Sequence, residues 1–294
     1  MRFHIRDLEQ FTGVKAHTIR VWERRYGLLK PDRTDTNIRT YDLDELKTIL
    51  NVAYLNQRGI KISRIAAMDQ GERERAVQDA ALREASADGV LNTLVMAMLA
   101  FDEELFERAC DEHAKRHGFR ALVEQVIVKL MERIGLLWQS SAICPAQEHF
   151  VSNLVRQRLI VAVAGLPKVA AGGPLNVLFL PEDEIHELGL LYMHYLLRAQ
   201  GQRTVYLGQS VPRGDLKQIA SLYPGPIRFV TLLVVRPAPD EALDYLNGLR
   251  ADMPEERLTF VAAGQPLGGI DPEHAPRGFT LYRDLNSLVR SIAG

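Results

Sequence analysis

The pattern of hydrophobic and polar positions changes twice along this chain of 294 residues. Up to about residue 70, apolar residues follow short helical patterns that are broken by glycines and by a turn-rich stretch. From 76 to 164 they recur at helical spacing, and after 174 short apolar runs alternate with helical patterns. The pattern predicts a multidomain α and α/β protein with parts at 1–72, 76–166 and 174–294.

The first part reads as a winged helix-turn-helix. A short helix at about 6–11 is followed by a turn at Gly13, and a second helix at about 17–26 ends at Gly27. The segment from Lys30 to Tyr41 is basic and rich in turn formers, as expected of a wing hairpin.

A third helix of the first part begins at Asp42, which forms a capping box with Glu45. Gly59 ends this helix, and a short helix containing Ile62 and Ile65 closes the part.

The second part is predicted to be a helical bundle, because three apolar stripes at helical spacing run through it. The stripes are Leu91, Leu94, Val95 and Met98; Leu122, Val126, Leu130 and Ile134; and Leu154, Leu159 and Ile160. Residues 165–174 are small and unpatterned, which indicates a linker.

The third part is predicted to be a flavodoxin-like doubly wound parallel sheet, because strands and helices alternate. The predicted strands are 176–180, 204–207, 229–235, 258–262 and, more weakly, 279–281. The predicted helices are 188–200, 212–222 with Pro212 at its first position, 240–250 and one from Asp284. Ligands of such sheets bind at the carboxyl ends of the strands.

Charge adds a separate indication. The formal net charge is −1, yet residues 1–41 hold nine Lys/Arg against five Asp/Glu, a local excess that suits phosphate neutralisation. Two cysteines without a CxxC motif argue against a disulfide framework, and no apolar run is long enough to cross a membrane. We expect a cytoplasmic protein.

The residues of the first part carry a recognisable motif. It consists of Thr12-Gly13-Val14, Thr18-Ile19-Arg20, the run from Trp22 to Leu29, Pro31-Asp32-Arg33-Thr34, and then Asn37, Arg39 and Tyr41. This string resembles the DNA-binding head of the MerR family. A surface-charged helical domain is the alternative, but charge alone would not need Trp22, Gly27 and the wing pattern.

The resemblance implies contacts with double-stranded promoter DNA. In a helix-turn-helix, the start of the second helix meets base edges, which places His17, Thr18 and Arg20 there and Arg24, Arg25 and Tyr26 near the flanking backbone. Arg33, Thr34, Asn37, Arg39 and Tyr41 belong to the wing. Trp22, Ile19 and Leu28 are expected in the core, and Glu23 is expected to orient neighbouring arginines.

Metal sensing is disfavoured, because the chain has neither a cysteine cluster nor a long heptad run after residue 70. His113 and His117 stand four residues apart and are able to hold a metal, but we expect an exposed helical pair.

The bundle and sheet together resemble cobalamin-binding modules. With a MerR-type head, the chain resembles the light-sensing cobalamin repressors of the CarH/LitR group. Trp138 is followed by nine residues and then Glu148-His149, the spacing of that group's upper-face motif. The resemblance implies that Trp138 covers the cofactor, Glu148 contacts the adenosyl group and His149 is a possible upper cobalt ligand. A core tryptophan beside an unrelated Glu-His pair remains the alternative.

A second motif departs from the family. Cobalamin domains use Asp-x-His-x-x-Gly after the first strand, and this chain has Glu184-Ile185-His186-Glu187-Leu188-Gly189. The resemblance makes His186 the lower cobalt ligand, the carboxylate its support and Gly189 a spacer for the corrin ring.

Two further family elements line the tunnel for the cofactor's nucleotide tail. The Ser-x-Leu element is replaced by Leu232-Leu233-Val234-Val235, and the Gly-Gly element is either Ala263-Gly264 or Gly268-Gly269. Cobalamin binding and a degenerate or differently liganded pocket therefore both stay open.

The leading hypothesis is a repressor, not an enzyme, whose self-assembly as homodimer or homotetramer depends on adenosylcobalamin and possibly on light. One alternative is a MerR-type regulator with a cofactor-independent domain used for oligomerisation or partner binding. A remote alternative is a corrinoid methyl carrier, for which a DNA-reading head would have no use.

Overall fold

The computed structural model describes residues 2–34, 37–83, 87–139, 143–169 and 172–293. The chain forms two compact units, Met1–Leu154 and Val155–Gly294. The three-part division drawn from the sequence stays a prediction.

The first unit begins with the predicted winged helix-turn-helix. Its elements are α1 (Ile5–Thr12), α2 (Ala16–Tyr26), β1 (Asp32–Arg33), β2 (Arg39–Thr40), α3 (Leu43–Gln57) and α4 (Ile62–Ala67). Gly13 and Gly27 end α1 and α2 with φ values of 71° and 63°, the left-handed backbone that favours glycine. β1 and β2 pair antiparallel as the wing.

The core of this region is built around α2 and α3. Ile19 and Trp22 are buried, as predicted, but Leu28 is only partly buried and its neighbour Leu29 takes the core position. The capping box of α3 is present, with Asp42 accepting a hydrogen bond from the Glu45 backbone N–H.

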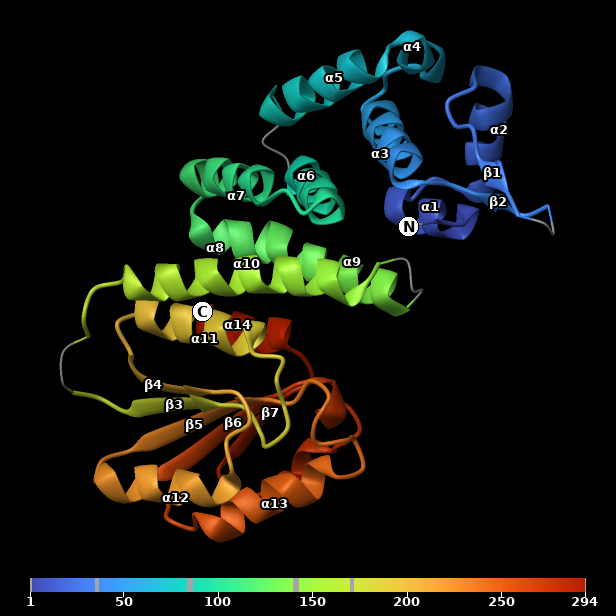
Figure 1. Ribbon diagram of the computed structural model, residues 1–294. Helices are drawn as coiled ribbons and strands as arrows, with labels where there is room; N and C mark the ends of the chain where they lie inside the picture. The colour runs from blue at the N-terminus through green and yellow to red at the C-terminus, as the bar shows by residue number, and fades with distance from the viewer. Residues whose placement is uncertain (1, 35–36, 84–86, 140–142, 170–171, 294) are drawn as a thin grey trace. The chain divides into compact units, whose positions relative to one another are not determined.

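Helices make up the rest of the first unit (Figure 1). They are α5 (Gln70–Arg83), α6 (Ala87–Ala100), α7 (Glu103–His117), α8 (Phe119–Leu122), a π-helical turn η1 (Val123–Ile127), α9 (Val128–Gln139) and the beginning of α10 (Pro145–Ala164). The predicted stripes are mostly buried, but Leu91 is only partly buried and Ile160, in the second unit's part of α10, is exposed.

The second unit contains the predicted parallel sheet. Its strands are β3 (Leu175–Phe179), β4 (Arg203–Gly208), β5 (Ile227–Leu232), β6 (Leu258–Ala263) and β7 (Phe279–Tyr282), in the order β4-β3-β5-β6-β7. The helices are α11 (Leu188–Ala199), α12 (Arg213–Leu222), α13 (Ala242–Asp252) and α14 (Leu285–Ala293), with 3-10 turns η2 (Gln265–Leu267) and η3 (Pro272–His274).

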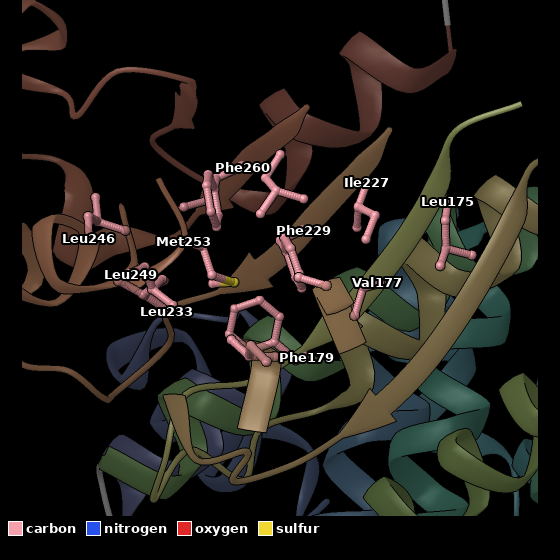
Figure 2. Close-up of a cluster of buried hydrophobic side chains, with 14 of the residues drawn as sticks. Leu175, Val177, Phe179, Ile227, Phe229, Leu233, Leu246, Leu249, Met253 and Phe260 are labelled. Atoms are coloured by element: carbon pink, nitrogen blue, oxygen red, sulfur yellow. The ribbon is translucent and has the colours of Figure 1, made fainter. Parts of the chain in front are cut away.

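The helices cover both faces of the sheet (Figure 1): α11 and α14 lie on one face, and α12 and α13 on the other. The α12/α13 face holds the core shown in Figure 2, where Phe229 lies between Phe179 and Phe260. The ring centroids are 6.3 Å and 5.5 Å apart. β3 lies between β4 and β5, so the order reverses there, and the loops after β3 and β5 meet at the edge where such sheets bind ligands.

Two predicted boundaries are wrong. The strand predicted to reach residue 235 ends at Leu232, because the N–H groups of Val234 and Val235 donate to Glu184 and not to a neighbouring strand. The side chains of Val234 and Val235 are exposed. Pro212 is the N-cap of α12 and not its first helical residue. Residues 170–171 of the predicted linker lie outside the described residues.

Throughout the described parts of the chain, no helix has the length and apolar character required to cross a bilayer. Over the same residues, no cluster of three or more His, Cys, Asp or Glu side chains is arranged to hold a metal ion.

Candidate DNA interface and cofactor site

The recognition helix α2 has a buried face and a basic exposed face. Ile19 and Trp22 fix the helix to the core, while His17 and Arg20 are exposed near its start. Thr18 lies beside His17, with 3.3 Å between the hydroxyl oxygen and Nε2. The helix therefore presents polar and cationic side chains from its first turns.

The turn before α2 is fixed by one carboxylate. Glu9 accepts a hydrogen bond from the Ala16 N–H at 3.1 Å and pairs with Lys15 at 3.0 Å. These two contacts, that of Lys15 foremost, lower the pKa of the Glu9 carboxyl. The carboxylate thus connects α1 to the first turn of α2.

The far end of α2 is also basic. Arg24 and Arg25 are exposed, and the Arg25 guanidinium lies 5.8 Å from the centroid of the Tyr26 ring. Both cations stand in the last turn of the helix, where positive charge also suits the helix dipole.

The wing is held by local hydrogen bonds. Arg33 donates to the Asn37 side-chain oxygen at 2.5 Å, and the Ile38 N–H donates to the Thr34 hydroxyl at 3.1 Å. Asn37 has a φ of 62°, which suits the tight turn. Residues 35–36 at the tip lie outside the described residues.

Glu23 connects α2 to the wing. Its carboxylate accepts hydrogen bonds from Arg39 Nε at 3.0 Å and from the Tyr41 hydroxyl at 3.1 Å, so it orients an arginine as predicted. Tyr41 does not fit the predicted contact role, because its side chain is fully buried. The structure assigns Tyr41 to positioning Glu23.

The upper-face motif lies around the ends of two helices. Trp138 stands near the end of α9 and is 48% exposed, so the alternative of a core tryptophan is wrong. Glu148 lies in the first turn of α10, and its carboxylate contacts the His149 ring at 2.8 Å and the Ser152 hydroxyl at 2.5 Å. The exposed Trp138 and His149 side chains are accessible to a ligand.

Glu184 lies at the switch point of the sheet, after β3. One carboxylate oxygen accepts from the backbone N–H groups of Ile185 and His186 and from the His186 ring. The other accepts from the N–H groups of Val234, Val235 and Arg236, at 3.3, 2.6 and 2.8 Å. This single side chain therefore joins the loop after β3 to the loop after β5.

Burial alone would raise the pKa of the Glu184 carboxyl. The N–H donors of Arg236, Val235 and His186, together with the His186 ring, outweigh burial and hold this pKa at about 2. Glu184 is therefore a carboxylate at neutral pH, and such a group only accepts hydrogen bonds.

The charge of Glu184 fixes the His186 ring. Nδ1 lies 2.6 Å from the carboxylate and must donate its proton to it, which leaves Nε2 to bind a further partner. The side chain is 53% exposed. A carboxylate behind Nδ1 is the usual support for a metal-bound imidazole, so these residues fit the lower cobalt ligand of a corrinoid.

A second buried carboxylate was not singled out by sequence reasoning. Glu187 accepts from Arg156 Nε at 2.5 Å and from the Tyr206 hydroxyl at 2.6 Å. Burial, with the hydrogen bond to Glu187, raises the pKa of Tyr206. In the sequence, the signal for this residue was a second acidic residue directly after His186. In the structure, Glu187 links the second half of α10 to β4.

The glycines of the predicted cofactor site have packing roles. A Cβ on Gly189 would lie 2.9 Å from a Leu232 methyl and 3.1 Å from one of Leu285, so the space beside this glycine is apolar and filled. A Cβ on Gly264, whose φ is 146°, would lie 1.8 Å from the Leu233 carbonyl oxygen. The close approach of β5 and β6 therefore requires Gly264.

Comparison with known proteins gives two family matches. Residues 3–72 match the MerR HTH family regulatory protein model, and residues 90–162 match the B12 binding domain model. The HTH-type transcriptional repressor CarH of Myxococcus xanthus is 30% identical, over 86% of this chain and 85% of its own length. The chain belongs to the CarH-type MerR regulators.

Two further similarities agree with this assignment. The repressor CarA of Myxococcus xanthus is 29% identical to this CarH-type regulator, over 86% of this chain and 84% of its own length. The monomethylamine corrinoid protein of Methanosarcina barkeri shares the fold, with a TM-score of 0.57 at 16% identity, over 71% of this chain and 98% of its own. The CarH-type chain is thus a DNA-binding transcription regulator with a B12 binding domain, and not an enzyme.

Proposed function

We propose that this chain is a cytoplasmic repressor that self-assembles on promoter DNA when it holds adenosylcobalamin, and that light releases it. The observation that carries the cofactor part is His186, exposed and oriented by a buried, ionised Glu184. The names of two relatives, both transcriptional repressors, support repression of transcription over activation.

DNA binding is assigned to the exposed face of α2 and to the wing. His17, Thr18 and Arg20 contact base edges, while Arg24, Arg25 and Tyr26 contact the phosphates of the flanking DNA backbone. Arg33, Thr34, Asn37 and Arg39 form the wing contacts, with Arg39 oriented by Glu23.

Nε2 of His186 would hold the cobalt of adenosylcobalamin, and Glu184 would keep the ring in the required tautomer. Trp138 and Glu148 would contact the adenosyl group, and the exposed His149 would offer a further nitrogen ligand. When bound, adenosylcobalamin supplies a cobalt–carbon bond that light breaks. A cofactor that binds the assembled state more tightly than the free chain by a few kcal/mol is enough to switch DNA occupancy.

The test is gel filtration and promoter retardation of the full chain, with and without adenosylcobalamin, in darkness and after green light. We expect a larger, DNA-retaining species only with the cofactor in the dark. An unchanged elution volume in all conditions would eliminate the switch.

A second measurement tests ligation. The adenosylcobalamin retained by the full chain should show the absorption spectrum of a cofactor with a nitrogen ligand on cobalt, and His186→Ala should either lose the cofactor or shift the spectrum to that of a cobalt without this ligand. His274→Ala, which removes an exposed histidine in η3, is the matched control and should bind as the unaltered chain does.

One observation favours a second candidate. Leu232 and Leu285 fill the space next to Gly189, where the family resemblance expects room for the corrin ring. A cofactor-independent domain that only oligomerises would account for this packing. A protein that stays colourless with adenosyl-, methyl- and hydroxocobalamin, yet still retains promoter DNA, would support this candidate over the first.

A further inference from the structure

One exposed side chain of the recognition helix α2 is apolar. The side chains that this helix exposes, all of its residues being described, are those of His17, Arg20, Val21, Arg24 and Arg25. Val21 is 40% exposed, and within this set it alone has neither a charge nor a hydrogen-bonding group. A single exposed valine is ordinary on a protein surface, so its meaning depends on where it lies.

Val21 lies in the middle of the face that is assigned to DNA. Side chains four residues apart are neighbours on a helix surface, which places Val21 between His17 on one side and Arg25 on the other. The opposite face is fixed to the core by Ile19 and Trp22, which are buried. The rotation of α2 that buries these two side chains therefore directs Val21 the same way as its basic neighbours.

The major groove offers a valine one kind of partner. Of the groups that the four bases present there, the 5-methyl group of thymine is the only methyl group, and the others include hydrogen-bond donors and acceptors on every base. A valine packed against those polar groups would remove them from water without replacing their hydrogen bonds, which costs free energy. A valine on a helix also has one strongly preferred rotamer, so a methyl contact costs it little conformational freedom.

We propose that Val21 recognises thymine: its methyl groups contact the 5-methyl group of one thymine in the half-site that each head binds. The proposal rests on the assignment of α2 to the major groove, and it adds an apolar, base-specific contact to the polar contacts already assigned. Phosphate contacts such as those assigned to Arg24 and Arg25 carry no sequence information directly. Val21 is therefore a specificity-determining residue of the head.

The test replaces thymine by uracil, which removes the methyl group and leaves base pairing unchanged. Each thymine of a promoter fragment that the full chain retains is replaced in turn, and affinity is measured by retardation in the cofactor state that retains the fragment. At one thymine of a half-site, the unaltered chain should bind about 4-fold more weakly, the loss expected for one buried methyl group. The same replacement should hardly change the affinity of Val21→Ala, whose shortened side chain no longer reaches the base.

The variant and its control are both expected to fold. Alanine is the best helix former, so Val21→Ala should not destabilise an exposed position of α2. Val161→Ala makes the same substitution at a valine of the second unit that is 70% exposed, and it should respond to uracil as the unaltered chain does.

Two results would overturn the proposal while the assignment of the head to DNA stands. One is an equal loss for the unaltered chain and Val21→Ala at every thymine, and the other is no loss for either protein at any thymine. In both cases the fragment is still retained, so the proposed repressor function is untouched. Failure of the unaltered chain to retain any promoter fragment would overturn the repressor function and the thymine contact together.

Discussion

At the scale of single residues, Glu184 is the most consequential side chain. Two loops far apart in sequence converge on its carboxylate, which is 1% exposed and fully hydrogen bonded. It determines where β5 stops, how the loop after it runs and which nitrogen of His186 faces outward.

Glu184→Gln should destabilise the second unit by about 2–3 kcal/mol at pH 7, because an amide NH2 group would face backbone N–H groups that now donate to the carboxylate. The measurement is denaturant unfolding, with Glu182→Gln, an exposed neighbour, as the control. Equal stability of the two variants would contradict the structure.

The same carboxylate predicts a pH dependence. Its pKa is lowered from 4.5 to about 2 on folding, so its stabilisation is complete above pH 4.5 and fades as the pH falls toward 2. The difference in unfolding free energy between the unaltered chain and Glu184→Gln should therefore shrink between pH 5 and pH 3. A difference that stays constant over this range would argue against an ionised, hydrogen-bonded Glu184.

In the sequence, Glu184 was a departure from the family motif, which has aspartate at this position. Spacing identified His186 and its carboxylate neighbour. Spacing was unable to show that the longer side chain reaches Val235, 51 residues away in sequence, because that contact exists only once both strands are placed.

At the scale of elements, helix ends were well predicted because caps are local chemistry. Gly13, Gly27 and the Asp42–Glu45 box all act within a few residues of sequence. The end of β5 was missed because its apolar run continues through Val235, and only a tertiary hydrogen bond stops the strand.

Asp42→Ala should cost about 1 kcal/mol of stability in the first unit, because it removes the N-cap acceptor of α3. Thermal unfolding compared with Asp44→Ala provides the check. Asp44 is 80% exposed and only 3.8 Å from Lys47, so its loss should be within a few tenths of a kcal/mol.

Gly264→Ala should destabilise the sheet by more than about 2 kcal/mol, since the new methyl group would meet the Leu233 carbonyl and the backbone would be strained. Gly269→Ala, where nothing lies within 4 Å, should be nearly neutral. Similar unfolding midpoints for both would show that β5 and β6 approach less closely than described.

At the scale of the whole molecule, charge is divided unevenly. The net charge is −1, while the DNA-binding head carries a local positive excess. The motif of residues 12–41, more than this excess of charge, allowed the sequence to identify the DNA-binding head. The sequence did not reveal that His113 is buried, so the expectation of an exposed pair with His117 is wrong, although Phe106 and Cys110 precede His113 at helical spacing and mark the buried face of α7.

Arg24→Gln should weaken promoter binding and make it less sensitive to salt. Each lost phosphate contact lowers the magnitude of the slope of log K against log salt by about 0.9, and by about twice that for a dimer with two heads. Retardation assays over a range of salt concentrations measure it. Arg277→Gln, an exposed cation of the second unit, should leave the slope unchanged.

The π-helical turn Val123–Ile127 has a consequence for Trp138. A π turn holds one residue more than an α turn, and one residue corresponds to about 100° of rotation about the helix axis. The π turn takes up its extra residue locally, so the helix faces that follow, including the side that bears Trp138, keep their directions. Deleting one residue of the turn, such as the exposed Glu124, should therefore give a regular α-helix and leave the indole on the same side of α9, whereas deleting a residue from the regular part of α9 would rotate it.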